Sequence, residues 1–251
     1  MTRGQLVAKR LVSRIKRLKS IVEQLLFDFK FLLSMPITHK LKLMTLLPKS
    51  KSQLRQDLFV LSNLSFMQKG YFVEFGAASG RELSNTYLLE TERHWTGILA
   101  EPANCWHGQL EMHRPNSLIE RTCVWRETGP SINFVETSDR ELSTIAEFNV
   151  CNNSESRKNE VVRYQVETIS LLDLLEKHRA PSHINYLSID TEGSEFEILK
   201  SFDFTMYSFD VITCEHNYTS DREKIYDLLV KNGYERVHPK VSLWDDWYVK
   251  S

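Results

Sequence analysis

Tyr71-Phe-Val-Glu-Phe-Gly-Ala-Ala-Ser-Gly80 is the stretch that decides the fold of this chain. Four of its first five residues are aromatic or β-branched, and small residues follow from Gly76 to Gly80. An apolar run that stops at small residues predicts a buried parallel strand followed by a tight loop. With a helix expected over residues 82–92, the stretch matches the first half of a nucleotide-binding βαβ unit.

Glu74 lies inside this apolar run, where an unpaired carboxylate would be costly. We therefore expect Glu74 to be bonded to loop N–H groups or to a cationic ligand. Gly76 and Gly80 allow the backbone to approach a ligand closely, and the first N–H groups of the expected helix would face that ligand.

Composition and charge restrict the class of protein. The length of 251 residues fits one α/β domain with an appendage, and 41% hydrophobic with 26% charged residues is typical of a soluble globular protein. Residues 1–51 carry 12 Lys/Arg against two acidic residues, a net charge of about +10. Because the whole chain has a net charge of −1, the remaining residues have a net charge of about −11. We expect a basic helical extension over residues 1–50 and a main domain over residues 51–251, whose acidity argues against nucleic acid as partner.

The cysteines and the apolar runs indicate the compartment. Cys105, Cys123, Cys151 and Cys214 lie far apart without a CxxC pair, which predicts free thiols in a reducing compartment. The sequence has no apolar run of 18 residues, and its N-terminus lacks the apolar core and cleavage site of a signal peptide. These features predict a cytoplasmic protein.

The N-terminal segment has helical periodicity that we expect Pro36 to end. Apolar residues recur at three- and four-residue spacing, with Lys and Arg between them, at Leu6, Val7, Leu11, Ile15, Leu18 and Val22. Two alternatives follow. Residues 1–35 form an amphipathic helix on an anionic surface such as the inner face of a membrane, or they form an extension packed on its own domain or in a homodimer.

A second short apolar strand ends in Glu101 and Pro102. Glu101 comes 21 positions after Gly80. That separation is the one at which nucleotide-binding folds place a carboxylate on the ribose hydroxyls. Because this spacing occurs together with the glycine loop, Glu101 is a candidate ribose ligand.

The rest of the chain predicts alternating elements. Strands are expected over residues 118–124, 131–135, 161–168, the first half of 184–199, 211–217, 234–237 and 246–249. Helices are expected over residues 52–68, 104–113, 170–177 and 221–231, and after Ser194. We expect the polar segment 136–160 to be a loop over the active site. This order predicts an α/β fold with a sheet that ends in an antiparallel hairpin.

Polar side chains follow two of the expected strands at the point where each strand ends. Asp190 and Glu192 follow the strand in 184–199, and Glu215, His216 and Asn217 end the next strand. In open α/β sheets, ligands lie outside the carboxyl ends of the strands. These side chains are therefore functional candidates at one shared edge of the sheet.

Several blocks in the same order give the chain a resemblance to the FkbM family of S-adenosylmethionine-dependent methyltransferases over about residues 52–250. The blocks are Phe72-Val-Glu-Phe-Gly-Ala-Ala-Ser-Gly80, Leu83-Ser-Asn-Thr-Tyr-Leu-Leu-Glu90, Gly97-Ile-Leu-Ala-Glu-Pro102, Leu187-Ser-Ile-Asp-Thr-Glu-Gly-Ser-Glu-Phe-Glu-Ile-Leu199, Val211-Ile-Thr-Cys-Glu-His-Asn-Tyr218 and Asp245-Asp-Trp-Tyr-Val249. The resemblance implies a class I methyltransferase, a Rossmann-like three-layer sandwich with a mostly parallel seven-stranded sheet. The implied activity is O-methylation of a hydroxyl on a sugar, glycan or secondary metabolite.

The resemblance also implies residue roles toward S-adenosylmethionine. The methionine part would contact Glu74, Phe75, Gly76, Ala77, Ser79 and Gly80, the ribose Glu101 and Pro102, and the adenine Cys123 and Val124, while Asp190 would face the methyl group. Ser79 is a departure, because the family often has an acidic residue there. A serine can bond a ligand but lacks the charge to meet a cationic group.

Two chemistries are open for removal of the acceptor proton. His216 alone could accept it, since the unperturbed pKa of histidine suits that role. Alternatively, Asp190, Glu215 and Asn217 could hold a divalent cation such as Mg²⁺ that acidifies the hydroxyl. In either case we expect His216, Asp190 and Glu215 to form the catalytic group.

Two other functions are compatible with the sequence. A catalytically weak methyltransferase-like scaffold, or a membrane-associated interaction protein, would use the basic N-terminal helix, and Ser79 favours a weakened cofactor site. An NAD(P)-dependent dehydrogenase is less well supported, because the loop has only Gly76 and Gly80 of a full G-x-G-x-x-G pattern.

Overall fold

The computed structural model describes residues 3–149 and 160–251, with side chains described from Leu18 onward. The chain divides into two compact units, Met1–Pro48 and Lys49–Ser251, which are described separately. Cys151 and residues 150–159 of the predicted 136–160 loop lie outside the described residues.

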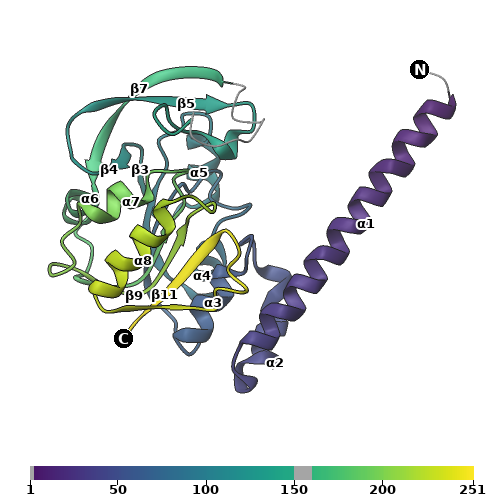
Figure 1. Ribbon diagram of the computed structural model, residues 1–251, viewed down its shortest axis with the longest axis horizontal. Coiled ribbons are helices and arrows are strands. Elements are labelled where there is room, and N and C mark those ends of the chain that lie inside the picture. The colour runs from purple at the N-terminus through teal and green to yellow at the C-terminus, as the bar shows by residue number, and fades with distance from the viewer. Residues whose placement is uncertain (1–2, 150–159) are drawn as a thin grey trace. The chain divides into compact units, whose positions relative to one another are not determined.

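The first unit is helical. It consists of α1 (Arg3–Ser34), α2 (Ile37–Leu46) and the start of a 3-10 turn, Leu47–Lys49. Figure 1 shows α1 as one long helix whose C-terminal part contacts α2. Pro36 lies between the two helices with ψ 137°, an extended value. The prediction that Pro36 ends the first helix is confirmed, because proline disfavours helical backbone in the residue before it.

A mostly parallel seven-stranded sheet forms the centre of the second unit. Its strand order is β10-β11-β9-β8-β1-β2-β3. The strands are β1 (Tyr71–Phe75), β2 (Thr96–Ala100), β3 (Leu118–Glu120), β8 (His183–Ile189), β9 (Ser208–Glu215), β10 (Tyr234–Val237) and β11 (Asp245–Lys250). Only the pairings of β11 with β9 and with β10 are antiparallel. The predicted sheet with an antiparallel C-terminal hairpin is therefore confirmed.

Parallel pairing brings distant parts of the sequence to one edge of this sheet. Phe75, the last residue of β1, is in register with Ala100 of β2 and Ile189 of β8. The residues that follow these three, Gly76, Glu101 and Asp190, therefore emerge side by side.

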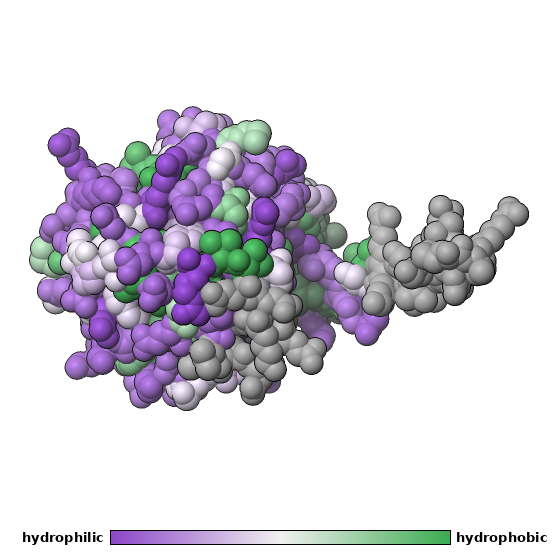
Figure 2. Space-filling view, turned by 90° about the horizontal axis from the view of Figure 1, so that it is seen from above, coloured by the Kyte–Doolittle hydropathy of each residue, from purple (hydrophilic) through white to green (hydrophobic). Residues whose placement is uncertain are grey.

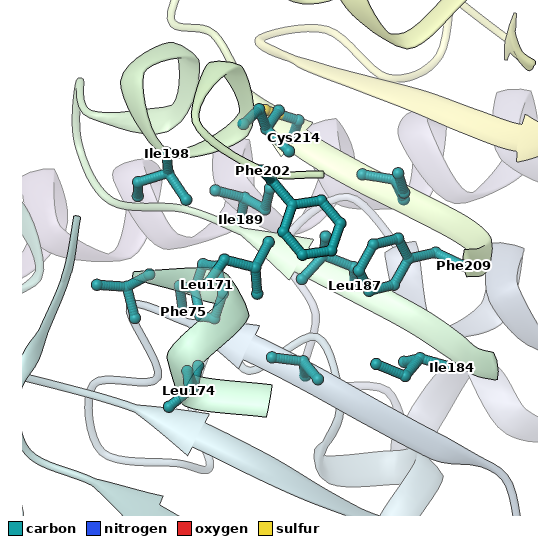
Figure 3. Packing of buried hydrophobic residues seen from close by; sticks show 14 of the residues in the cluster. Phe75, Leu171, Leu174, Ile184, Leu187, Ile189, Ile198, Phe202, Phe209 and Cys214 are labelled. Atoms are coloured by element: carbon teal, nitrogen blue, oxygen red, sulfur yellow. The ribbon is translucent and has the colours of Figure 1, made fainter. Parts of the chain in front are cut away.

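Short helices complete the layers around the sheet. They are α3 (Gln56–Asn63), α4 (Tyr87–Arg93), α5 (His107–His113), α6 (Leu171–Lys177), α7 (Glu195–Lys200) and α8 (Asp221–Lys231). Figure 3 shows the buried side chains of the strands gathered against α6 and α7, with Phe202 and Phe209 at a ring separation of 5.7 Å. The surface in Figure 2 is mostly hydrophilic where it is described, so the apolar residues of this unit are largely internal.

A second sheet of four strands was not predicted. Its order is β4-β7-β5-β6, with β4 (Cys123–Trp125), β5 (Ser131–Thr137), β6 (Thr144–Ile145) and β7 (Glu160–Ser170). Figure 1 shows β5 and β7 curving together as a separate layer. The single strand predicted over residues 118–124 is divided between the two sheets. The Glu120 carboxylate accepts hydrogen bonds from the N–H groups of Arg121 and Thr122, which turns the chain between β3 and β4.

The helix predicted over residues 82–92 begins later, at Tyr87. The Asn85 N–H and the Ser84 and Thr86 hydroxyls instead donate hydrogen bonds to Glu74. Side chains and N–H groups that are bonded in this way favour a turn over a helix. The expected start of this helix at Glu82 is therefore wrong.

Candidate functional site

A cavity that is open to solvent, with about 860 Å³ of empty space including its mouth, lies at the edge where the parallel strands end. Nine of the sequence-predicted site residues line it, namely Glu74, Phe75, Gly76, Ala77, Glu101, Pro102, Cys123, Val124 and Asp190. They come from the ends of β1, β2 and β8 and from β4 of the second sheet. The cavity therefore lies between the two sheets. The sequence predicted residues of its wall but did not predict the second sheet.

Gly76 lets the loop after β1 pass against the end of β8. Its φ is +72°, and a Cβ at this position would lie 1.8 Å from the Asp190 carbonyl oxygen. The Gly76 N–H donates to the Ala100 carbonyl at 3.0 Å, which extends the pairing of β1 with β2 into the loop. Only glycine combines this conformation with this close backbone approach.

Glu74 is buried and heavily hydrogen-bonded at the wall of the cavity. It accepts hydrogen bonds from the Asn85 N–H at 2.7 Å, the Thr86 hydroxyl at 2.5 Å and the Ser84 hydroxyl at 3.1 Å. The expectation that Glu74 is bonded to loop N–H groups is confirmed. Its carboxylate fixes the loop between β1 and α4, and its contact with a cofactor stays a prediction.

Arg114, which sequence reasoning missed, holds the loop between β1 and α4 through buried hydrogen bonds. Its side chain is 0% exposed and donates to Glu90 at 2.6 Å, the Thr86 hydroxyl at 2.9 Å and the Gly80 carbonyl at 3.1 Å. A guanidinium nitrogen also lies 3.7 Å from Glu74. No local pattern marks Arg114, since an arginine just after a short helix is usually a surface residue.

Glu101 lies on the cavity wall after β2, and its role as a ribose ligand stays a prediction. Its two carboxylate oxygens accept hydrogen bonds from the N–H groups of Ala78 at 2.7 Å and Ala103 at 2.8 Å. These bonds orient the carboxylate at the end of β2, on the cavity wall. Burial raises the pKa of Glu101 to about 7, so its charge changes near neutral pH.

One end of the cavity is apolar. Cys123 and Val124 are joined there by Phe134, Ile145 and Trp106. Phe134 and Ile145 lie opposite each other on the antiparallel strands β5 and β6. Sequence reasoning missed these three residues, although it placed the segment that begins at residue 136 over the active site. An apolar slot of this kind can accept a flat aromatic ring.

Ser79 and Gly80 do not line the cavity. Ser79 is buried, and its carbonyl oxygen lies 2.8 Å from Nδ1 of His113. Gly80 has a positive φ of 73°, and its carbonyl accepts a hydrogen bond from Arg114. Both residues shape the loop, and their contact with a cofactor stays a prediction.

Three carboxylates meet beside the cavity, at the ends of β8 and β9. One oxygen each of Asp190, Glu192 and Glu215 lies within 4.8 Å of the others, so these residues could hold a metal ion. The Asn217 amide nitrogen is 2.7 Å from Glu215 and 3.5 Å from Glu192, so Asn217 donates to the carboxylates instead of adding an oxygen ligand. The arrangement thus combines Asp190 and Glu215 of the predicted metal set with Glu192.

The closeness of these carboxylates changes their acidity. Burial, together with the neighbouring charge of Asp190, raises the pKa of Glu215 well above its ordinary value. Like charges in a buried site repel each other, and a cation placed between them offsets that repulsion. The acidic cluster is therefore suited to a cationic ligand, either a positively charged small molecule or a metal ion.

Glu195 holds the turn that carries this cluster, and sequence reasoning missed it. One carboxylate oxygen accepts hydrogen bonds from the N–H groups of Thr191 and Gly193, each at 3.0 Å. Glu192 lies between them with φ +61°, a conformation that is uncommon for a residue with a side chain. The turn directs Glu192 to the cavity, which it lines together with Asp190.

A second cavity, of about 1150 Å³, lies beyond the acidic cluster. Its lining includes Glu215, His216, Asn217, Tyr218 and Phe148. Because Asp190 and Glu192 line the first cavity and Glu215 the second, the acidic cluster stands where the two spaces adjoin.

His216 is buried, with its ring turned toward the protein. Nδ1 accepts a hydrogen bond from the Tyr218 N–H at 2.9 Å, and Nε2 lies 3.7 Å from a carboxylate oxygen of Asp246. Burial lowers the pKa of His216, although the charge of Asp246 acts in the opposite direction. The ring is therefore buried between Tyr218 and Asp246, and its role as a base stays a prediction.

A family model described as the methyltransferase FkbM domain matches residues 74–236. No curated protein sequence matches the chain.

Several solved structures are similar in fold. The methyltransferase FkbM from Methylobacillus flagellatus KT is 12% identical with a TM-score of 0.48, over 92% of this chain and 60% of that one. The precorrin-6y C5,15-methyltransferase from Geobacter metallireducens GS-15 is 12% identical with a TM-score of 0.41, over 72% and 71%. A TehB-like SAM-dependent methyltransferase from Corynebacterium glutamicum is 8% identical with a TM-score of 0.41, over 85% and 97%.

The matched segment carries the glycine loop, Glu101 and the whole acidic cluster, and it extends over more than half of the chain. The chain therefore belongs to the FkbM family of S-adenosylmethionine-dependent methyltransferases.

Proposed function

We propose that this protein transfers a methyl group to a hydroxyl of a sugar, a glycan or another secondary metabolite. One observation carries the proposal: the acidic cluster of Asp190, Glu192 and Glu215 stands where the two cavities adjoin. A transfer reaction needs two molecules to meet at one point with a group that can take up a proton there.

The first cavity fits S-adenosylmethionine by the chemistry of its walls. The apolar end at Val124, Phe134 and Ile145 suits the adenine, and Glu101 can accept hydrogen bonds from the ribose diol. The acidic end at Asp190 and Glu192 suits the cationic amine and sulfonium. When bound, S-adenosylmethionine supplies an activated methyl group on its sulfur.

The second cavity fits a hydroxyl-bearing acceptor. Glu215 and Asn217 offer hydrogen-bond acceptors and donors, while Tyr218 and Phe148 offer aromatic surface. Tyr218 is 66% exposed, so its ring is accessible to a ligand. Sugar rings combine hydroxyls with apolar C–H faces, and this mixture of side chains recognises both.

The acidic cluster is placed best to take the acceptor proton. The raised pKa of Glu215 makes its ionised carboxylate a stronger base than an ordinary glutamate, and a bound cation beside Glu215 and Asp190 would favour that ionised form. His216 would need to turn its ring to reach an acceptor, because Nδ1 is bonded and Nε2 is buried. A divalent cation such as Mg²⁺ held by Asp190, Glu192 and Glu215 is the other arrangement that this cluster permits.

Substitutions in the cluster are expected to separate these chemistries. Glu215→Gln should lower the turnover number by about a hundredfold or more while S-adenosylmethionine affinity changes only a few fold, because it removes a base and leaves the first cavity. Radiolabelled methyl transfer to a panel of sugars, with parallel calorimetry, measures both quantities. Glu223→Gln, an exposed change on α8, should alter neither.

The same assay with EDTA and with His216→Asn tests the remaining roles. Turnover that survives EDTA, falls in Glu215→Gln and persists in His216→Asn supports the carboxylate as base. Loss of turnover in EDTA that Mg²⁺ restores supports the metal arrangement. Full turnover in Glu215→Gln with collapse in His216→Asn would show that histidine is the base.

Cofactor affinity is expected to depend on pH through Glu101. Because its pKa is raised to about 7, ionisation increases as pH rises through that value. If only the carboxylate binds the ribose diol, S-adenosylmethionine affinity should increase about tenfold between pH 6 and pH 8. Isothermal titration calorimetry measures this change. Glu101→Gln should bind more weakly and lose that part of the pH dependence, and an identical pH profile in both proteins would contradict the assignment.

The structure gives less support than the sequence to the alternative of a catalytically weak scaffold. Ser79, the feature that favoured it, does not line the cavity, so its missing charge does not weaken the acidic end. Absence of S-adenosylmethionine binding at millimolar concentration would nevertheless favour the scaffold over the enzyme.

A further inference from the structure

Helix α1 carries an exposed apolar stripe. Seven large apolar side chains between its middle and its C-terminal end are each 46–63% exposed, namely Leu18, Ile21, Val22, Leu25, Leu26, Phe29 and Leu33. At 3.6 residues per turn these positions fall on one side of the helix, within an arc of about 140°. The sequence continues the same spacing toward the N-terminus with Val7, Leu11 and Ile15.

This stripe differs from the side of α1 that is already buried. Phe31 and Met35 are buried, as are Leu43 and Leu46 of α2, and the two helices contact each other. By helical spacing, Phe31 lies about 155° away from the centre of the stripe. Helix α1 therefore has one apolar side that is covered and another that is open.

The stripe contrasts with the described surface of the second unit in Figure 2. The face shown in Figure 2 is mostly hydrophilic over the described residues, with apolar residues scattered across it. A continuous row of large apolar side chains is costly in water and marks a surface that another apolar phase covers.

The charge around the stripe distinguishes between possible occupants. Helix α1 carries eight Lys/Arg against Glu23 and Asp28, and six of the eight lie in residues 3–17, on the N-terminal side of the stripe. A second copy on the same stripe would bring two strongly basic helices together, which is repulsive. An anionic lipid surface provides both an apolar phase and compensating negative charge. An arc of about 140° is also wider than the narrow seam of a two-stranded coiled coil.

We propose that the apolar stripe of α1 docks on the surface of an anionic lipid bilayer, with the helix lying in the interface. None of the described helices has the length and hydropathy of a membrane span. Residues 18–33 would provide a contact about 24 Å long. This proposal does not depend on the methyl acceptor or on catalysis.

Flotation of the full chain with liposomes tests the proposal. The protein should float with vesicles of phosphatidylcholine and phosphatidylglycerol, and much less with phosphatidylcholine alone. The double variant Leu25→Ser and Phe29→Ser should bind at least about tenfold more weakly. Met112→Ser, which removes an apolar side chain of α5 that is even more exposed, is the control and should bind as the parent does.

The unfolding temperature and the oligomeric state of each variant distinguish loss of docking from misfolding and from dimerisation. All proteins should unfold at the same temperature, because the substituted side chains are exposed. Absence of flotation with anionic vesicles, or flotation that is unchanged in the double variant, would overturn the proposal. A dimer that the double variant converts to a monomer, without vesicle binding, would assign the stripe to a second copy instead.

Discussion

Replacing Arg114 with methionine is expected to lower the free energy of unfolding by about 3–5 kcal/mol. The guanidinium is fully buried between Glu74 and Glu90. Methionine fills part of the volume but leaves two buried carboxylates without their cation, which is more costly than losing an exposed ion pair. Chemical denaturation followed by tryptophan fluorescence measures the change.

Arg121→Met is the matched control for this prediction. Arg121 is 59% exposed and is paired with Glu111 on the surface, where such a pair contributes about 0–1 kcal/mol. The two substitutions are chemically identical and differ only in burial and partners. Equal shifts in the two variants would show that the buried network does not stabilise the loop after β1.

The second large effect is expected at Gly76. Gly76→Ala should weaken S-adenosylmethionine binding by about a hundredfold or more, because a loop displaced by roughly 1 Å disturbs every contact that it positions. The new Cβ would lie 1.8 Å from the Asp190 carbonyl oxygen, at a φ of +72° that alanine rarely adopts. Calorimetric titration of the folded variant measures the affinity.

Gly108→Ala provides the comparison within the same protein. A Cβ at Gly108 has nothing within 4 Å, and the residue lies in α5, where alanine is favoured over glycine by up to about 1 kcal/mol. Binding should therefore be unchanged and stability equal or slightly higher. Normal cofactor affinity in Gly76→Ala would show that the loop can move away from β8 at little cost.

Local patterns in the sequence were sufficient for the central elements. The apolar run before Gly76 predicts β1, and the polar residues after the strands in 184–199 and 211–217 predict a site at one edge of the sheet. These inferences hold because strand periodicity, glycine geometry and the position of parallel strand ends depend on neighbouring residues. The spacing from Gly80 to Glu101 likewise follows from the length of one βα unit.

The start of α4 and the division of residues 118–124 could not be predicted in this way. Ser84, Asn85 and Thr86 form a turn because they bond Glu74, which is ten or more residues earlier in the chain. Strand β4 pairs with β7, whose residue Thr168 lies opposite Cys123. Both outcomes depend on partners that are far away in sequence, and local propensity does not contain them.

The sequence by itself determined the class of fold, the glycine loop and the identity of nine of the residues around the cavity. Only the tertiary structure decided that Arg114 lies beneath the loop, that Glu192 joins Asp190 and Glu215, and that His216 turns toward Asp246. The physical reason is that burial and pairing of charges are set by three-dimensional neighbours. A charged residue has the same local pattern on a surface as in a buried network, and the two differ only in what the folded chain places around it.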